Sequence, residues 1–528
     1  MRTVYRNGVV HASGPIAPTA LLVEDGLIAW LGPDGDAPGD VDEVVDLDGA
    51  LVTPGFVDAN VRALETGLTA AGVELSGASS LVEALDLLAA AADVHGLVVA
   101  SGWDETGWPE GRPPTPEEVS RAVAGRQAYV VRADGRSAVV TAELADGAGC
   151  RNRAGWAEGL VFGPAHAAAR SAVRLADPER RAAFVRVGLW ALAASGVVSV
   201  HEHSTPELDT RDGLAQMLAE SADPWSGLPE VVGYRVELCG DADDARRLAE
   251  EVPGLVGVGT PPVDGTLEAR SAALRMPYAD ADHGTLGELA LTAEQIANHV
   301  GAATRAGLQA VVPVVGDRAM SEVLLGFQAA ADVEGVPAIR AARHRLENAA
   351  MIDTPALARI LLMGLTVSVQ PLLDVASGRR RERFTRRLGP ARVAGLSPYA
   401  DLVGAGIPVA FGSASPMGRV EPWAAIRAAA VRQEPSQRLS SQAAFAAHTT
   451  GGYLAAGRAG RGELLPGTPA SFAAWRLPSG HAQSFGRGDP EARAGLDRGV
   501  LPDLSDLDGL PLCVCTVRDG VVLHRETE

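Results

Sequence analysis

The 528-residue chain contains no lysine, so all of its cationic side chains except the histidines are arginines. A lysine carbamate is therefore excluded as a metal ligand at every position. The chain has only four cysteines, and their spacing predicts neither a disulfide framework nor a zinc knuckle. No apolar run reaches the ~20 residues of a membrane-spanning helix, and the first residues contain no apolar signal core. These absences predict a cytoplasmic protein that has no membrane partner.

The charge balance restricts the partners that this chain can bind. Its formal net charge is −20 and its isoelectric point is near 5.0. An excess of negative charge repels phosphate groups, so nucleic acid is not expected as a partner. A small molecule or another protein is compatible with the composition. With 47% hydrophobic residues, a chain of this length can bury a large core, and we expect two or three structural units.

Both ends of the chain are rich in short strands separated by turns. Residues 1–53 contain TALLVEDG and LIAWLG, and residues 456–528 contain ASFAAWRLP and LCVCTVRDGVVLHRE. Asp-Gly and Gly-Pro steps punctuate these segments, as is typical of turns between strands. We therefore expect one small β-sandwich that is formed by both termini.

The middle of the chain alternates between helices and buried strands. Four helical stretches end at glycine and run directly into an apolar strand, for example ATRAG-LQAVVPVVGD and ILLMG-LTVSVQP. Further strand-like segments, beginning with PGFVDAN, bring the count to eight, which predicts a (β/α)8 TIM barrel. The barrel is expected over residues 54–62 and 179–455. Residues 63–178 do not follow the alternation and predict an insertion subdomain after strand one.

Several motifs of the chain occur in the order and spacing of a known family. They include VTPGFVDAN, SGWDETGWPEGRPPT, VVGDRAM, RHRLENA and AFGSASPM. With these motifs the chain resembles the amidohydrolase superfamily, and within it the amidohydrolase family 3 branch, which includes N-substituted formamide deformylases. The resemblance extends over nearly the whole length. It implies a (β/α)8 barrel with a small β-sandwich, an assembly into homo-oligomers, and the hydrolysis of non-peptide carbon–nitrogen bonds by metal-activated water.

The resemblance also implies metal ligands at the carboxyl ends of the barrel strands, and this sequence departs from that pattern. The family pattern has His-x-His after strand one, histidines at strands five and six, an aspartate at strand eight, and a further histidine in an inserted DGH motif. The DGH histidine is replaced by Arg136, and the other positions are Asn60, Arg62, Pro313, Asn348 and Ala414. None of these is a good zinc ligand, and Arg62 is a permanent cation. We therefore predict that the family metal site is lost and that no cofactor is bound.

Some polar residues remain as candidates for other chemistry. His201 and His203 lie two apart at the end of a predicted strand, so they share a face and are candidates for a relocated metal site or a general base. The alternative is that His201 is hydrogen-bonded within the fold and His203 lines a polar mouth. Arg62 is a third catalytic candidate, because Arg62 together with Ala414 would keep a local charge of about +1 without a metal.

Other polar residues are expected either to line a pocket or to lie on the surface. The candidates for pocket lining are Asp58, Arg136, Glu202, Asp317 and Glu347. Asp317 and Glu347 could instead brace loops at the barrel mouth, and for Glu347 this structural role is favoured. The basic run RRRERFTRR after strand seven either grips an anion or forms a solvated loop, and the sequence favours the loop.

Two functions follow from this pattern. The first is a pseudoenzyme of the amidohydrolase family that acts by binding a ligand or another protein. The second is an active hydrolase of amide-like or formamide-like bonds, with a metal-free or relocated site. Because function resides in the site and not in the fold, the resemblance alone does not decide between them.

Overall fold

The computed structural model describes residues 1–12, 18–133, 135, 137–175, 177–281, 284–374, 379–478, 501, 502, 504 and 509–526. The chain forms two compact units. Unit 1 comprises residues 1–61, 192–204 and 218–528, and unit 2 comprises residues 62–191 and 205–217. Within the described residues, no helix has the length and apolar character needed to cross a membrane.

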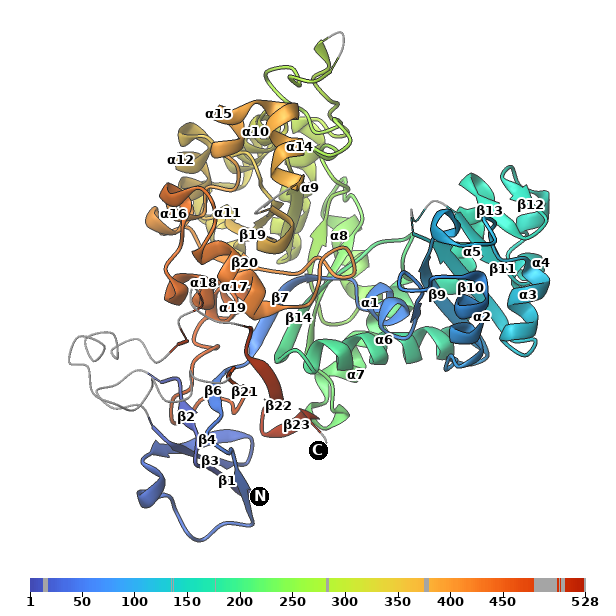
Figure 1. Cartoon of the computed structure of the whole chain (residues 1–528). Helices are drawn as coiled ribbons and strands as arrows, with labels where there is room; N and C mark the ends of the chain where they lie inside the picture. The colour runs from blue at the N-terminus through green and yellow to red at the C-terminus, as the bar shows by residue number, and fades with distance from the viewer. Residues whose placement is uncertain are drawn as a thin grey trace. The chain divides into compact units, whose positions relative to one another are not determined.

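The centre of unit 1 is a sheet of eight parallel strands, which confirms the predicted TIM barrel (Figure 1). Their order in the sheet follows their order along the chain, with β7 and β20 at the two ends. The strands are β7 (Phe56–Val61), β14 (Val197–Ser204), β15 (Glu230–Val236), β16 (Leu255–Gly259), β17 (Gln309–Val314), β18 (Arg345–Asn348), β19 (Thr366–Val369) and β20 (Val409–Phe411).

Contacts between the first and last strands bring the two ends of the barrel sheet together. Ala414, three residues after the end of β20, donates its backbone amide to the carbonyl of Asn60 at 2.9 Å. A parallel bridge joins Val61 to Ser415. Gly412 is required here, because a Cβ at this position would lie 2.6 Å from the Asn60 amide nitrogen. The sheet is therefore a nearly closed barrel.

The barrel strands form where valine-rich runs are buried on both faces. All residues of β14 and of β19 are buried, as expected for parallel strands covered by helices. The helix α9 begins with a capping box of Thr292 and Gln295 and ends at Gly307, whose φ of 73° is the left-handed conformation that glycine adopts without strain. The pairing of β17 with β18 is regular through Pro313.

Along the chain, helices alternate with the barrel strands, and most residues of the first two of these helices belong to unit 2. The helices are α6 (Pro178–Ala193), α7 (Arg211–Ala222), α8 (Ala242–Glu251), α9 (Ala293–Ala306), α10 (Asp317–Glu334), α11 (Val336–Ala342), α12 (Thr354–Met363), α13 (Pro371–Asp374), α14 (Arg379–Leu388), α15 (Pro390–Ala394), α16 (Tyr399–Gly404), α17 (Pro422–Ala430), α18 (Ser441–Ala447) and α19 (Thr450–Ala455).

Both termini contribute to the predicted β-sandwich of unit 1. One sheet has the order β4-β3-β1-β5, and the other has the order β2-β6-β21-β22-β23 and joins N-terminal to C-terminal strands. Side chains of both sheets, such as Tyr5, Ile28, Phe472 and Val517, form one apolar core. The strands are β1 (Arg2–Arg6), β2 (Val9–Val10), β3 (Ala20–Glu24), β4 (Leu27–Gly32), β5 (Glu43–Asp46), β6 (Leu51–Pro54), β21 (Phe472–Arg476), β22 (Leu512–Arg518) and β23 (Val521–Arg525).

Unit 2 contains the segment that follows β7, where the sequence predicts an insertion. Its sheet has the order β12-β13-β11-β10-β9-β8, and Trp103 and Trp108 are buried in its apolar core. The elements are α1 (Ala63–Ala70), β8 (Val73–Glu74), α2 (Leu81–Ala89), β9 (Leu97–Trp103), α3 (Pro116–Ala122), β10 (Gln127–Arg132), β11 (Ser137–Val140), α4 (Ala142–Gly147), β12 (Trp156–Ala157), β13 (Leu160–Phe162) and α5 (Gly163–Leu175).

Candidate functional site

Most of the positions of the expected metal ligands meet at one edge of the barrel. Asn60 lies near the end of β7, Pro313 near the end of β17, and Asn348 is the last residue of β18. Ala414 follows β20 by three residues. Because the strands are parallel, their carboxyl ends share this edge, which is where the active sites of barrel enzymes lie.

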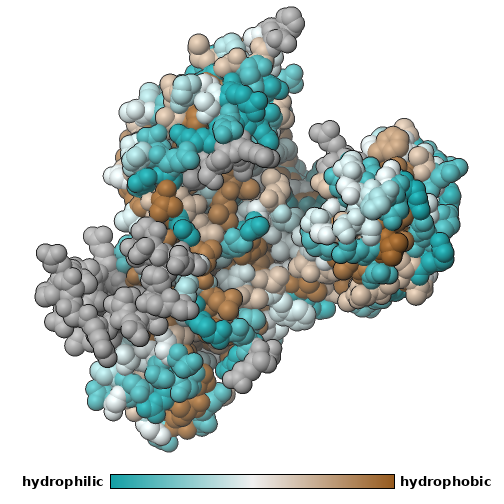
Figure 2. Space-filling view, in the orientation of Figure 1, coloured by the Kyte–Doolittle hydropathy of each residue, from teal (hydrophilic) through white to brown (hydrophobic). Residues whose placement is uncertain are grey.

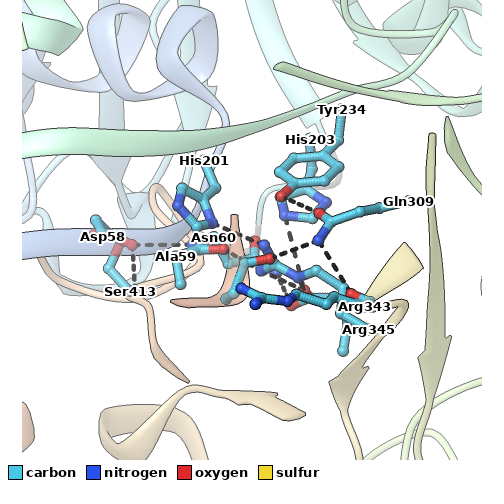
Figure 3. Close-up of polar contacts among 12 residues, drawn as sticks. Asp58, Ala59, Asn60, His201, His203, Tyr234, Gln309, Arg343, Arg345 and Ser413 are labelled. Atoms are coloured by element: carbon cyan, nitrogen blue, oxygen red, sulfur yellow. Dashed lines mark hydrogen bonds and ion pairs between the residues drawn. The ribbon is translucent and has the colours of Figure 1, made fainter. Parts of the chain in front are cut away.

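Arg345, which is labelled in Figure 3, forms a buried ion pair with Glu347 in the interior of the barrel below this edge. Both side chains project from β18, and both are at most 2% exposed. The guanidinium donates from Nε to Glu347 Oε1 at 2.6 Å and from Nη2 to the carbonyl of Ala59 on β7 at 2.6 Å. Burial opposes the positive charge, but Glu347 and Tyr234 together outweigh it, so the pKa of Arg345 is raised. The interior therefore holds a fixed protein cation.

Asn60 binds the other oxygen of the same carboxylate. Its amide nitrogen Nδ2 donates to Glu347 Oε2 at 2.8 Å. Since β7 and β18 are not neighbours in the sheet, this bond runs through the barrel interior, so the side chain of Asn60 points inward. The donor end of the amide is directed at the carboxylate, and both oxygens of Glu347 are engaged.

His201 is tied to the same ion pair from the other side. Nη1 of Arg345 lies 2.7 Å from Nδ1 of His201. A guanidinium can only donate, so Nδ1 is the acceptor and the neutral ring carries its proton on Nε2. Burial, followed by the charge of Arg345, holds the pKa of His201 well below its usual value. The ring is therefore neutral over the physiological pH range.

His203 packs on an aromatic neighbour in the same interior. Its ring stacks on Tyr234 of β15, with the planes 12° apart and the centroids at 5.1 Å. Its Nε2 is 3.9 Å from Glu347 Oε1, which is beyond a hydrogen bond. The hydroxyl of Tyr234 donates to Gln309 Oε1 at 2.8 Å, and the guanidinium of Arg345 lies 5.0 Å from the centre of the Tyr234 ring. The polar groups of β14, β15, β17 and β18 thus form one connected network.

Asp58 lies beside this network and is bonded to the end of β20. Its Oδ1 accepts the amide of Ser413 at 2.8 Å and that of Asn60 at 3.2 Å. The side chain is buried, and this burial raises the pKa of Asp58 to about 6 despite the two donors. Asp58 therefore titrates close to neutral pH.

The remaining candidate residues lie outside the network. Glu202 is buried on the face of β14 opposite His201, because the pairing of β14 with β15 is regular and successive side chains alternate. Asp317 accepts the backbone amides of Arg275 and Arg318 at 2.9 Å, which organises the start of α10. Arg62 is the cap residue of α1 and belongs to unit 2. Arg136 lies outside the described residues.

These residues do not fit the divalent metal of the amidohydrolase pattern. Among the residues that the structure describes, no group of three or more His, Cys, Asp and Glu side chains is arranged to hold a metal ion. Of the donors that face the interior, Glu347 is bonded to Arg345 and Asn60, and Nδ1 of His201 accepts from Arg345. A cation placed here would also face the charge of the guanidinium.

The sequence analysis missed Arg345, Tyr234 and Gln309. A signal for Arg345 was present, because alternation places it on the same face of β18 as Glu347, which is expected to point into the barrel. A charged residue at such a position must find a partner inside the protein. Tyr234 and Gln309 gave no comparable signal, since both residue types are common in strands and at strand ends.

The fold and the site now allow comparison with known proteins. A model of the amidohydrolase family (Amidohydro_3) matches residues 43–524, and the chain belongs to this family. It is 25% identical to the protein LONG AFTER FAR-RED 3 of Arabidopsis thaliana, over 88% of this chain and 85% of that protein. It is 26% identical to the exoenzymes regulatory protein AepA of Pectobacterium carotovorum subsp. carotovorum, over 62% of this chain and 76% of that protein.

A solved structure has the same fold. The crystal structure of an uncharacterized metal-dependent hydrolase from Pyrococcus furiosus superposes with a TM-score of 0.73 and covers 90% of this chain and 98% of that chain. The two sequences are 23% identical. This likeness concerns the fold.

Proposed function

We propose that this chain is a non-catalytic member of the amidohydrolase family that acts by binding a ligand or another protein. The observation that carries the proposal is the closed set of bonds around Arg345. Its guanidinium holds Glu347, His201 and a carbonyl of β7 in the interior of the barrel. Glu347 and His201 are of metal-ligating residue types, and both are bonded to a cation of the protein itself.

The interior also offers groups that suit the binding of a polar ligand. Nε2 of His201 carries a proton and has no hydrogen-bond partner among the described residues, and the hydroxyl of Ser199, on the same face of β14, also has none. Buried donors of this kind are satisfied by ordered water or by polar atoms of a ligand. The regulatory role in the name of AepA agrees with a function other than hydrolysis.

A second candidate is a hydrolase of amide-like or formamide-like bonds that works without the family metal. The observation that favours it is Asp58, because a carboxyl group with a pKa of about 6 is suited to general acid–base catalysis near neutral pH. Against it, Oδ1 of Asp58 already accepts two backbone amides. A metal relocated to His201 and His203 is less compatible with the structure, since Nδ1 of His201 is engaged by Arg345.

The first experiment is elemental analysis of untagged protein, purified without a chelator, for zinc, iron, manganese and nickel. A parallel assay follows the hydrolysis of N-substituted formamides, with and without added zinc or manganese, in the wild type and in Asp58→Asn. We expect metal far below one ion per chain and no hydrolysis above the rate of the buffer.

The possible outcomes separate the two functions. Near-stoichiometric metal, together with hydrolysis that a chelator abolishes, would overturn both the loss of the metal site and the non-catalytic role. Metal-free hydrolysis that is lost in Asp58→Asn would establish the second candidate. If neither metal nor hydrolysis is found, ligands are sought as compounds that raise the melting temperature of the wild type but not that of Asn60→Ala.

A further inference from the structure

The basic segment after β19 is a helix and not the solvated loop that the sequence favoured. Helix α14 has the sequence RRRERFTRRL and is anchored by Phe384 and Leu388, which are at most 4% exposed. These two residues pack against Leu267, Leu274 and Tyr278 of the segment that follows β16, and against α15. The apolar side of the helix is therefore fixed, and its charged side is presented to solvent.

The charged side of α14 contrasts with the acidic character of the whole chain. Its described side chains include four arginines, at positions 381, 383, 386 and 387, and one glutamate at 382. In the part of the chain that the structure describes, Arg381, Arg383 and Arg386 form no ion pair. On α8, by contrast, Arg246 and Arg247 pair with Asp243 and Asp244.

A second observation is a hollow beside this cluster. It has a volume of about 740 Å³ and is lined by Arg381, Glu382, Thr385, Arg386 and Gln433. The four helix residues are spaced at i, i+1, i+4 and i+5, so they share one face of α14. Figure 2 shows hydrophilic side chains gathered at the end of unit 1 where Figure 1 places α14 and α15.

We propose that this hollow binds a small multivalent anion that carries phosphate or carboxylate groups. Guanidinium groups bind such anions with paired, charge-assisted hydrogen bonds. Arg381 and Arg386 supply the two cations, and the amide of Gln433 supplies a neutral donor. Glu382 opposes the anion, but arginines outnumber it on the helix.

The hollow beside α14 shares no residue with the network around Arg345. The proposal that it binds an anion therefore does not depend on the proposed function. Its occupant is a small molecule and not a nucleic acid, because the net charge of −20 opposes an extended polyanion.

Isothermal titration calorimetry with sodium pyrophosphate and with citrate, in metal-free buffer, tests the proposal. The variant is Arg381→Gln/Arg386→Gln, and the matched control is Arg246→Gln/Arg247→Gln on α8, which removes the same charge elsewhere. We expect wild type and control to bind at least one of the two anions, and the α14 variant to bind it about tenfold or more weakly. Added salt should weaken binding in parallel, because it screens exposed charges.

Two results would overturn the site. One is that neither anion binds the wild type at millimolar concentration. The other is that the α14 variant and the control bind the anion with the same affinity. The binding would then depend on the net charge of the protein and not on Arg381 and Arg386. Equal melting temperatures of all three proteins without ligand exclude misfolding as the cause of a loss.

Discussion

Arg345 and His201 face each other across the interior of the barrel, with Nη1 of the arginine 2.7 Å from Nδ1 of the histidine. They come from β18 and β14, which are separated by three strands in the sheet. The contact fixes the tautomer of the histidine and gives the guanidinium a neutral acceptor in addition to Glu347. The barrel interior is thus held together by a charged group of the protein.

Replacing Arg345 with methionine should strongly destabilise the protein. The change leaves Glu347 buried with only Asn60 as a bonded partner among the contacts described above. Removing one partner of a buried ion pair typically costs about 3–5 kcal/mol, because the other charge stays uncompensated. Urea unfolding, followed by circular dichroism at neutral pH, measures the loss.

Two further variants test the reason for that loss. Arg345→Met/Glu347→Leu removes both charges, and we expect it to recover a large part of the stability. Arg246→Met, at an exposed ion pair of α8, should change the unfolding free energy by less than about 1 kcal/mol. If the double variant were less stable than Arg345→Met, the charge of Glu347 would not be the cause.

Replacing Asp58 with asparagine should make stability less dependent on pH in the acidic range. Burial raises the folded pKa of Asp58 to about 6, above the ~3.9 of an unfolded chain. The folded state therefore binds the proton more tightly, and the stability that this proton provides is lost as the pH rises through about 6. This contribution to the free energy of unfolding falls by about 2 kcal/mol between pH 4 and pH 7.

The asparagine keeps the two amide contacts, because Ser413 and Asn60 both donate to Oδ1. The stability of Asp58→Asn relative to wild type should therefore increase from pH 4 to pH 7. The measurement is the unfolding free energy in urea at several pH values, with Asp212→Asn at an exposed position as the control. A constant difference over this range would show that Asp58 has no raised pKa.

The barrel could be predicted from the sequence because its signals are local and repeated. Several strands are valine-rich runs that follow a helix, as at Val197–Ser204 and Gln309–Val314, and all eight expected strands were found. The β-sandwich gave a similar signal at both ends of the chain. The helix α14 was missed because its many arginines mask Phe384 and Leu388, which are the residues that anchor it.

The network at the centre of the barrel could not be predicted in the same way. Its bonds join residues that are up to 287 positions apart, such as Asn60 and Glu347. Alternation along a strand places a side chain on a face, but it does not give the partner across the barrel. The sequence therefore identified Asn60, His201 and Glu347 one by one, and it gave no indication that Arg345 joins them.

Replacing His448 with asparagine should reduce the loss of stability in mild acid. Burial lowers the pKa of His448 to about 4, partly offset by the hydrogen bond between its Nδ1 and the Val57 carbonyl at 3.0 Å. The unfolded chain, with a histidine pKa near 6.5, binds the proton more readily, so this group destabilises the folded state as the pH falls below about 6.5. Its contribution is about 2 kcal/mol between pH 7 and pH 5.

In His448→Asn the side-chain amide can still donate to the Val57 carbonyl, while the titrating group is gone. We therefore expect the variant to lose about 2 kcal/mol less than the wild type between pH 7 and pH 5. His95→Asn removes an imidazole at an exposed position and serves as the matched control. Equal pH slopes for His448→Asn and wild type would mean that His448 is protonated in the folded protein. The buried position at the start of the barrel, against Phe56 and Phe411, argues against a charged ring there.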